Sequence, residues 1–157
     1  DKSWAHELGI ADPAEWSERR SAELLKQRKA AAFEEERRKF EERAREAEKA
    51  KDERAALKAC MASLECWGEK AAFQAAFHCA PVIERFAKHD FEWTDGMLEP
   101  KFSQYRWKDK RVGIVTVMGD KIKMQNGFGA WTYMTYECDI DPLTEAVSDV
   151  RVAEGRL

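Results

Sequence analysis

Four cysteines are the residues in this 157-residue chain whose type and spacing most directly imply chemistry. An even number of cysteines in a small domain predicts disulfides if the compartment is oxidising, and a metal site or a catalytic thiol if it is not. The four positions are Cys60, Cys66, Cys79 and Cys138. Spacing alone does not prove how they pair.

The pairing that we favour is Cys60 with Cys66 and Cys79 with Cys138. In an unbroken helix, residues six apart are separated by about 9 Å along the axis, which is beyond disulfide range. The first bond therefore requires a break in the helix, for which Ser63 and Gly68 are the candidate positions. The second bond would join a helix to a later strand.

Two alternatives for the cysteines stay open at this point. A zinc site would combine thiolates with His78 or His89, but the spacing lacks the close ligand pairs that zinc sites usually have. A reversible redox pair is disfavoured because C-x5-C lacks the tight turn that lowers a thiol pKa in C-x-x-C motifs. We expect no metal and no cofactor.

Acidic residues near the end of the chain raise the possibility of calcium. Asp139, Asp141 and Glu145 have some of the spacing of an EF-hand loop. That loop needs an oxygen ligand at its fifth position and glycine at its sixth, where this chain has Leu143 and Thr144. A plain turn is expected instead.

A second polar cluster could in principle supply an acid and a base. His89 and Asp90 are followed closely by Glu92 and Asp95. No nucleophile, oxyanion site or phosphate-binding loop accompanies them, so we expect a loop between helix and sheet. The sequence predicts no catalytic residue.

Charge argues against two classes of partner. The net charge is −3 with both signs interleaved, so no basic face would bind nucleic acid and no polybasic cluster would bind an anionic membrane. Aromatic and cationic residues alternate from Tyr105 to Lys108, but alternation on a strand places them on opposite faces, which favours a core role for the aromatics. The chain contains no run of eighteen apolar residues, so the sequence predicts no membrane-spanning helix.

The elements that carry these residues differ sharply between the two parts of the chain. Between Pro13 and Lys58 there are 14 Lys and Arg and 12 Asp and Glu. The later part holds all three Tyr, six of the eight Phe and all four Cys. We expect a charged helical arm over residues 1–58 and a small α+β domain over residues 59–157.

The arm has a strong helix start and a weak seam for self-association. Asp12 and Pro13 suit the cap and the first helical position, with Ile10 and Ala11 placed for an apolar staple. Phe33 and Phe40 repeat by seven, but most companion heptad positions are charged. A lone or weakly dimerising helix is expected, and a coiled-coil pair is the alternative.

Acid and base side chains four residues apart should help to hold this helix together. The predicted ion pairs are Glu15/Arg19, Glu34/Arg38, Glu35/Lys39 and Glu41/Arg45.

The domain should consist of a second helix followed by an antiparallel meander. Apolar positions at spacings of three and four predict the helix, with Pro81 kinking it; they are Phe73, Ala76, Phe77, Ala80, Ile83 and Ala87. Alternating pairs predict the strands; they are Phe91/Trp93, Tyr105/Trp107, Val115/Val117, Ile122/Met124, Trp131/Tyr133, Tyr136/Cys138 and Val150/Val152. Expected turns are Gly119-Asp120, Asn126-Gly127 and Asp141-Pro142.

The hairpin from Gln125 to Trp131 is the preferred surface for contact with a protein partner. Asn126 and Gly127 would build a projecting turn, while Phe128 and Trp131 would supply the aromatic area that binding hot spots favour. The alternative is that Phe128 folds back to cover the edge of the sheet.

Several motifs resemble an uncharacterised family of bacterial exported or membrane-anchored proteins. They are Cys66-Trp67-Gly68, Trp93-Thr94-Asp95-Gly96, Gly119-Asp120-Lys121-Ile122, Gln125-Asn126-Gly127-Phe128-Gly129-Ala130 and Tyr136-Glu137-Cys138. The resemblance covers about the last hundred residues. It implies an extracytoplasmic location and a disulfide between a helix and a later strand, and it implies no activity.

These observations together predict a non-enzymatic extracytoplasmic module that binds a protein and is carried on a helical spacer. The chain begins at Asp1 rather than Met, which indicates that a natural start has been removed and leaves open whether a signal or anchor segment was removed with it. An enzyme inhibitor or immunity-type protein is the alternative function, and a hydrolase ranks below both.

Overall fold

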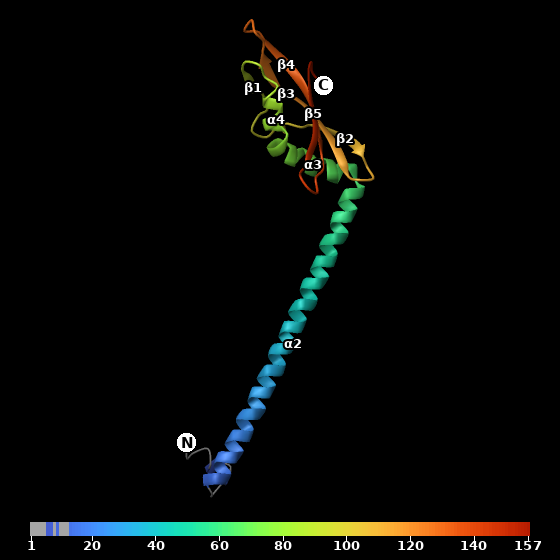
Figure 1. Cartoon of the computed structure of the whole chain (residues 1–157). Coiled ribbons are helices and arrows are strands. Elements are labelled where there is room, and N and C mark those ends of the chain that lie inside the picture. Colours follow the sequence, from blue (N-terminus) through green and yellow to red (C-terminus); the bar gives the residue numbers. More distant parts are fainter. Residues whose placement is uncertain (1–5, 8, 10–12) are drawn as a thin grey trace. The chain divides into compact units, whose positions relative to one another are not determined.

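The computed structural model describes residues 6, 7, 9 and 13–157 (Figure 1). The chain divides into two compact units, residues 1–54 and 55–157. Composition placed the boundary at residues 58 and 59, a few positions further along the same helix. The expected cap at Asp12 and the staple at Ile10 and Ala11 lie outside the described residues.

Helix α2 (Pro13–Ala62) provides the expected arm. It runs for 50 residues, about 75 Å at 1.5 Å per residue. Neither Gly nor Pro occurs after its first position, so nothing in the sequence interrupts the backbone hydrogen bonds. Its large apolar side chains are exposed, with Phe33 at 67% and Phe40 at 71%.

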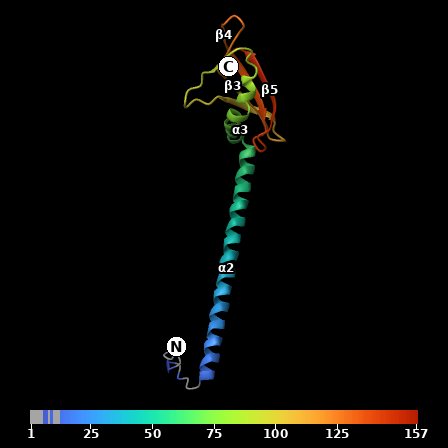
Figure 2. The same ribbon diagram turned by 60° about the vertical axis from the view of Figure 1, so that its left-hand side comes forward.

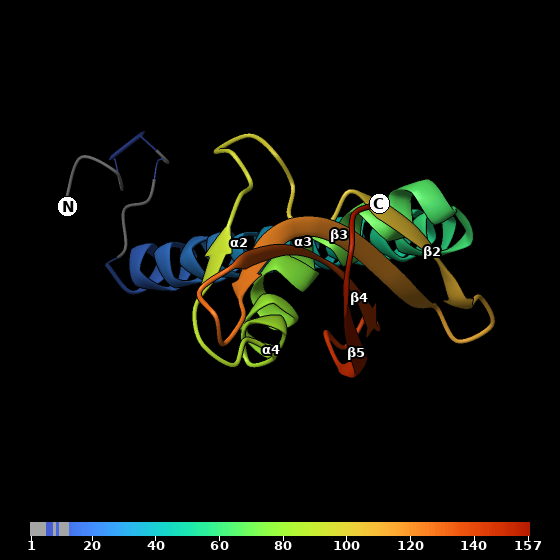
Figure 3. The ribbon, with the colours of Figure 1, turned by 90° about the horizontal axis from the view of Figure 1, so that it is seen from above.

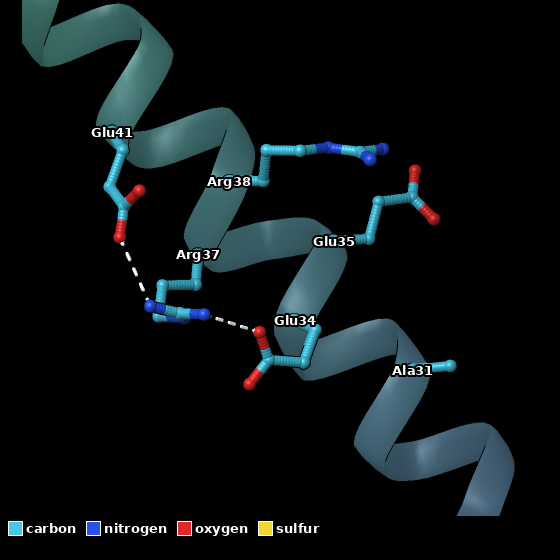
Figure 4. A pocket seen from close by; sticks show the side chains of 6 residues that line it. All are labelled: Ala31, Glu34, Glu35, Arg37, Arg38 and Glu41. Atoms are coloured by element: carbon cyan, nitrogen blue, oxygen red, sulfur yellow. Dashed lines mark hydrogen bonds and ion pairs between the residues drawn. The ribbon is translucent and has the colours of Figure 1, made fainter.

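Ion pairs along α2 follow the predicted pattern in part. Arg19 pairs with Glu15, and Lys39 pairs with Glu35. The pairs predicted for Glu34 with Arg38 and for Glu41 with Arg45 are replaced, because Arg37 lies between the two acids and bonds both (Figure 4). One guanidinium has five donors, so it can satisfy both carboxylates at once.

The helix break that the cysteine spacing requires lies at Ser63. Helix α3 (Leu64–His78) begins there, and the Ser63 hydroxyl accepts a hydrogen bond from the Cys66 amide at 3.4 Å. Gly68 is not the break. It lies inside α3, where an added Cβ would come within 2.2 Å of the Tyr105 ring.

A short helix, α4 (Ala80–Glu84), follows Cys79. Pro81 stands in its first turn, where the missing amide hydrogen costs no helical hydrogen bond. The predicted single helix with a kink is therefore two helices that meet at Cys79.

The sheet contains five antiparallel strands, and helix α3 packs mainly against β2, β3 and β4. In Figure 2, α3 lies beside the sheet. The strands are β1 (Phe91–Trp93), β2 (Gln104–Asp109), β3 (Ile114–Gln125), β4 (Trp131–Ile140) and β5 (Val147–Glu154). Strands β3, β4 and β5 form a meander, and both β1 and β2 pair with the other edge of β3. The predicted α+β class is confirmed.

Strand β3 corrects one predicted turn. Gly119-Asp120 is not a hairpin but an irregularity inside a continuous, curved strand, where the pairing with β4 shifts (Figure 3). An added Cβ at Gly119 would lie 2.2 Å from the Lys101 carbonyl oxygen and 2.5 Å from the Tyr136 hydroxyl. The glycine is needed for close approach, because the Tyr136 hydroxyl donates to that carbonyl and accepts from the Lys121 amide at this point.

The residues of α3 that pack on the sheet are not the large apolar residues that the sequence pattern predicted. Phe73 and Phe77 are 70% and 65% exposed, and they contact each other edge to face. The buried face instead consists of Trp67, Ala71 and Ala75. Gly68 is buried on the same face, and its contact with the Tyr105 ring shows that the backbone of α3 lies close to β2 there.

Both favoured disulfides are present, and no free cysteine remains. Cys60 and Cys66 have Cα atoms 5.2 Å apart across the break at Ser63. Cys79 and Cys138 are both fully buried and join the end of α3 to β4. The zinc and free-thiol alternatives are therefore wrong for this structure.

Candidate binding surface at the β3–β4 hairpin

The loop between β3 and β4 spans residues 126–130 and is held by its own hydrogen bonds. The Asn126 side-chain oxygen accepts from the amides of Phe128 and Ala130, each at 3.0 Å. The Asn126 amide donates to the Ala130 carbonyl at 2.8 Å. Gly129, with φ of +81°, supplies the left-handed residue.

This loop is longer than the tight Asn-Gly turn that the sequence predicts. Gly127 does not adopt a positive φ, so the left-handed position falls at Gly129 instead. The Gln125 side-chain amide nitrogen, Nε2, donates to the Gly129 carbonyl at 3.1 Å, which closes the base of the loop. Asn126 is thus the organising residue, as an Asx turn requires.

Phe128 extends from this loop into solvent. Its side chain is 99% exposed, and Trp131 at the start of β4 is 43% exposed. The loop is the orange tip beyond β4 in Figure 1. The alternative in which Phe128 folds back over the sheet edge is therefore wrong.

A pocket of about 300 Å³ lies beside the hairpin. It is lined by Phe86, Lys88, His89, Met124, Gln125, Asn126, Gly127, Thr132, Met134 and Glu154. The loop forms one wall, since an added Cβ at Gly127 would stand 3.3 Å from His89 Nε2. Three of the predicted contact residues, Gln125, Asn126 and Gly127, therefore also line this pocket.

Sequence reasoning did not find this pocket. Its other residues come from the segment after α4, from β3 and β4 and from the end of β5, and the sheet register brings these strands together. The one available signal was His89, just before a strand, in the segment where the sequence predicts a loop between helix and sheet.

The outer face of the sheet carries an ion network around Asp139. Arg151 bonds both oxygens of Asp139 at 2.9 and 3.0 Å, and the Thr116 hydroxyl donates to it at 2.6 Å. Burial alone would raise the pKa of Asp139, but the hydrogen bonds from Arg151, Thr116 and Lys108 outweigh burial and lower the pKa to about 2.

Glu137 extends the same network. The bidentate hydrogen bond from Arg106 is the main reason that the pKa of Glu137 lies below its usual value, with Arg151 adding to it. Every acid in this network faces a cation, which is the arrangement of a structural network on a sheet face. Arg106 lies on this face while Tyr105 and Trp107 pack on the core, so the face separation predicted for β2 is confirmed.

The remaining polar candidates do not form a site. Asp141 accepts from the Leu143 amide and the Thr144 hydroxyl within a turn. Glu145 bonds Gln74 and His78 instead of approaching Asp139. Across residues 6, 7, 9 and 13–157, no three His, Cys, Asp or Glu side chains gather as metal ligands would.

His89 and Asp90 are likewise separated in role. Asp90 accepts from the Phe91 amide at 2.9 Å at the start of β1, while His89 lines the pocket. Asp95 bonds Lys101 at 2.7 Å in the loop between β1 and β2. The hollow that Figure 4 shows is lined only by residues of one exposed helix, α2, so it does not form a binding site.

No helix in the described part of the chain combines the length and the apolar character needed to cross a bilayer. Comparisons of the chain with family models, with curated proteins and with solved structures found no match.

Proposed function

We propose that this protein is an extracytoplasmic protein-binding module whose partner contacts the β3–β4 hairpin. The observation that carries the proposal is the exposure of Phe128 on a hydrogen-bonded loop. Burying a phenylalanine side chain is worth about 1.5–3 kcal/mol, and the free protein leaves this gain unused. A partner that covers Phe128 would obtain it.

The rigidity of the loop supports the same proposal. Binding costs free energy when a flexible segment must be ordered. Here Asn126, Gly129 and Gln125 already fix the loop, so little ordering remains. Aromatic side chains such as Phe128 and Trp131 lose few rotamers and contribute large contact areas, as binding hot spots do.

The compartment and the role of the arm belong to the same proposal. Two disulfides in a domain of about a hundred residues are typical of proteins that fold in an oxidising environment. Helix α2 would act as a spacer between the domain and an anchor or a second partner. Weak pairing of two arms through Phe33 and Phe40 would be compatible with that role.

Site-specific photo-crosslinking tests the proposal. A photoreactive phenylalanine analogue is placed at position 128, and at position 73 as a control of comparable exposure on α3. In the native envelope we expect a discrete crosslinked protein from position 128 and not from position 73. Identical products from both positions, or no product from position 128, would contradict the proposal.

A further inference from the structure

The pocket beside the hairpin has an apolar part. Met124 on β3, Met134 on β4 and Phe86, after α4, are the large apolar residues that line it. Met124 is 7% exposed, whereas Phe86 is 46% exposed. Flexible methionine side chains adapt to apolar groups of different shape, so this part of the pocket can receive an aliphatic or aromatic side chain.

The two ends of the pocket carry opposite charges. Lys88 and His89 precede β1, which pairs with β3. Glu154 lies on β5, opposite Met134 of β4. Among the described residues, no side-chain hydrogen bond or ion pair engages Lys88, His89 or Glu154, so all three side chains are free to bind a ligand.

The sheet register sets the separation of these ends. Strand β3 lies between β1 and β4, and β5 follows β4. At roughly 4.8 Å per strand, the backbone of Glu154 is offset by about 10 Å from β3 and by about 14 Å from β1, which follows Lys88 and His89. One or two residues of extended chain, at about 3.4 Å each, fit between the inward-reaching side chains at the two ends.

The residues that line the pocket match the three groups at the carboxyl end of a polypeptide: its carboxylate, its last side chain and a backbone amide. A terminal carboxylate can bond the Lys88 ammonium and a ring nitrogen of His89. The terminal side chain can rest on Met124 and Met134, and a backbone amide can donate to Glu154. A volume of about 300 Å³ stands at the lower end of ligand pockets, which suits one or two residues and not a longer segment.

We propose that this pocket binds the carboxyl-terminal residue of a partner polypeptide, with an apolar side chain in that position. This inference rests on the proposed function, because it names the chemistry of the partner at the same end of the sheet. Capture of a terminal carboxylate is an established mode of peptide recognition. Phe128 then contacts the partner outside the pocket.

NMR titration of the isotope-labelled full chain tests the inference. The probe is N-acetyl-glycyl-leucine, and the controls are its carboxyl-terminal amide and hexanoate. We expect the acid to shift the amide signals of Lys88, Asn126 and Thr132 in a saturable manner. The amide and hexanoate should bind at least about threefold more weakly, since each lacks one of the matched groups.

Variants separate specific binding from general charge attraction. Lys88→Gln should weaken the binding of N-acetyl-glycyl-leucine by roughly threefold to fivefold. Thr132→Trp should abolish saturation by filling the pocket. Lys110→Gln, in the turn at the other end of β3, should have no effect. If Thr132→Trp fails to fold, the affinity of Lys88→Gln for N-acetyl-glycyl-leucine still tests the inference.

Three results would overturn the inference: equal binding of acid and amide, equal binding of hexanoate, or shifts that leave the pocket residues unmoved. This titration can fail while the hairpin contact through Phe128 still holds, so the two failures are distinguishable. Phe128→Ser should retain the affinity of the parent protein for N-acetyl-glycyl-leucine, because Phe128 does not line the pocket.

Discussion

At the scale of single residues, Asp139 shows how a buried charge can stabilise this domain. Its side chain is almost fully buried, yet Arg151, Thr116 and Lys108 all reach it from neighbouring strands. The pKa of Asp139 falls from 3.8 to about 2, so the folded state favours the charged carboxylate. Such a group stabilises the fold above its unfolded pKa and loses that effect as pH falls through the folded pKa.

Replacing Asp139 by Asn should therefore lower the free energy of unfolding by about 2 kcal/mol at pH 7. The difference from the parent protein should shrink between pH 4 and pH 2, where the parent carboxylate becomes protonated. Denaturant unfolding at a series of pH values measures this. Asp149→Asn is the matched control, since Asp149 also bonds Arg151 but is largely exposed.

The control variant should change stability by less than about 0.5 kcal/mol at every pH. If Asp149→Asn and Asp139→Asn lose the same free energy with the same pH dependence, the hydrogen bonds from Arg151, Thr116 and Lys108 to Asp139 are not the source of the effect.

At the scale of elements, the two disulfides constrain very different lengths of chain. Cys79–Cys138 closes a loop with a sequence separation of 59, and Cys60–Cys66 closes one with a separation of 6. In the chain-entropy model, the long loop contributes about 4 kcal/mol and the short one about 2 kcal/mol. The helix–strand bond should matter more.

We expect the paired substitution of Cys79 and Cys138 by Ala to lower the free energy of unfolding more than the paired substitution of Cys60 and Cys66. Alanine is used because both buried sulfurs are fully inaccessible, and a serine hydroxyl would add an unpaired polar group. Denaturant unfolding under non-reducing conditions gives the comparison. An equal loss from the two pairs, or a reversed order, would contradict the loop-length argument.

Sequence patterns located most elements correctly. Alternation found β1, β2 and β5, and the absence of Gly and Pro found α2. The Cys60 and Cys66 spacing required a helix break, which the structure has at Ser63. These signals are local, since each depends on a few consecutive residues.

The wrong predictions concern residues whose local sequence pattern is compatible with two tertiary structures. Gly119 is compatible with a hairpin turn, but in the structure it leaves room for the Tyr136 hydroxyl. Tyr136 is seventeen positions later in the chain, so a pattern of neighbouring residues does not reveal this contact. Phe73 and Phe77 repeat with helical spacing just as Ala71 and Ala75 do. Only the distance between α3 and the sheet decides which set is buried.

The candidate site was predictable in part for the same reason. Asn126 and Gly127 identify a hairpin from sequence alone, but the length of its loop depends on Gly129. The exposure of Phe128 was not decidable, because an aromatic residue in a loop can equally cover an edge. The pocket needs Lys88, Thr132 and Glu154 together, and these come from three distant segments.

At the scale of the whole molecule, the two units have different physical characters. The first is a solvated helix whose ion pairs are exposed and individually weak, at about 0.2–0.5 kcal/mol each. The second buries an aromatic and aliphatic core and carries both disulfides. Such a division fits a spacer joined to a recognition domain, which is the function proposed above.

The most direct test of this function is Phe128→Ser, measured for stability and for partner capture in the same preparation. Phe128 is 99% exposed, so we expect the free energy of unfolding to change by less than about 0.5 kcal/mol. Capture of the protein that crosslinks to position 128 should be lost. Phe73→Ser, at an exposed position on α3, should be equally stable and should still capture that protein. A stable Phe128→Ser variant that captures the same partner as the parent would contradict the account.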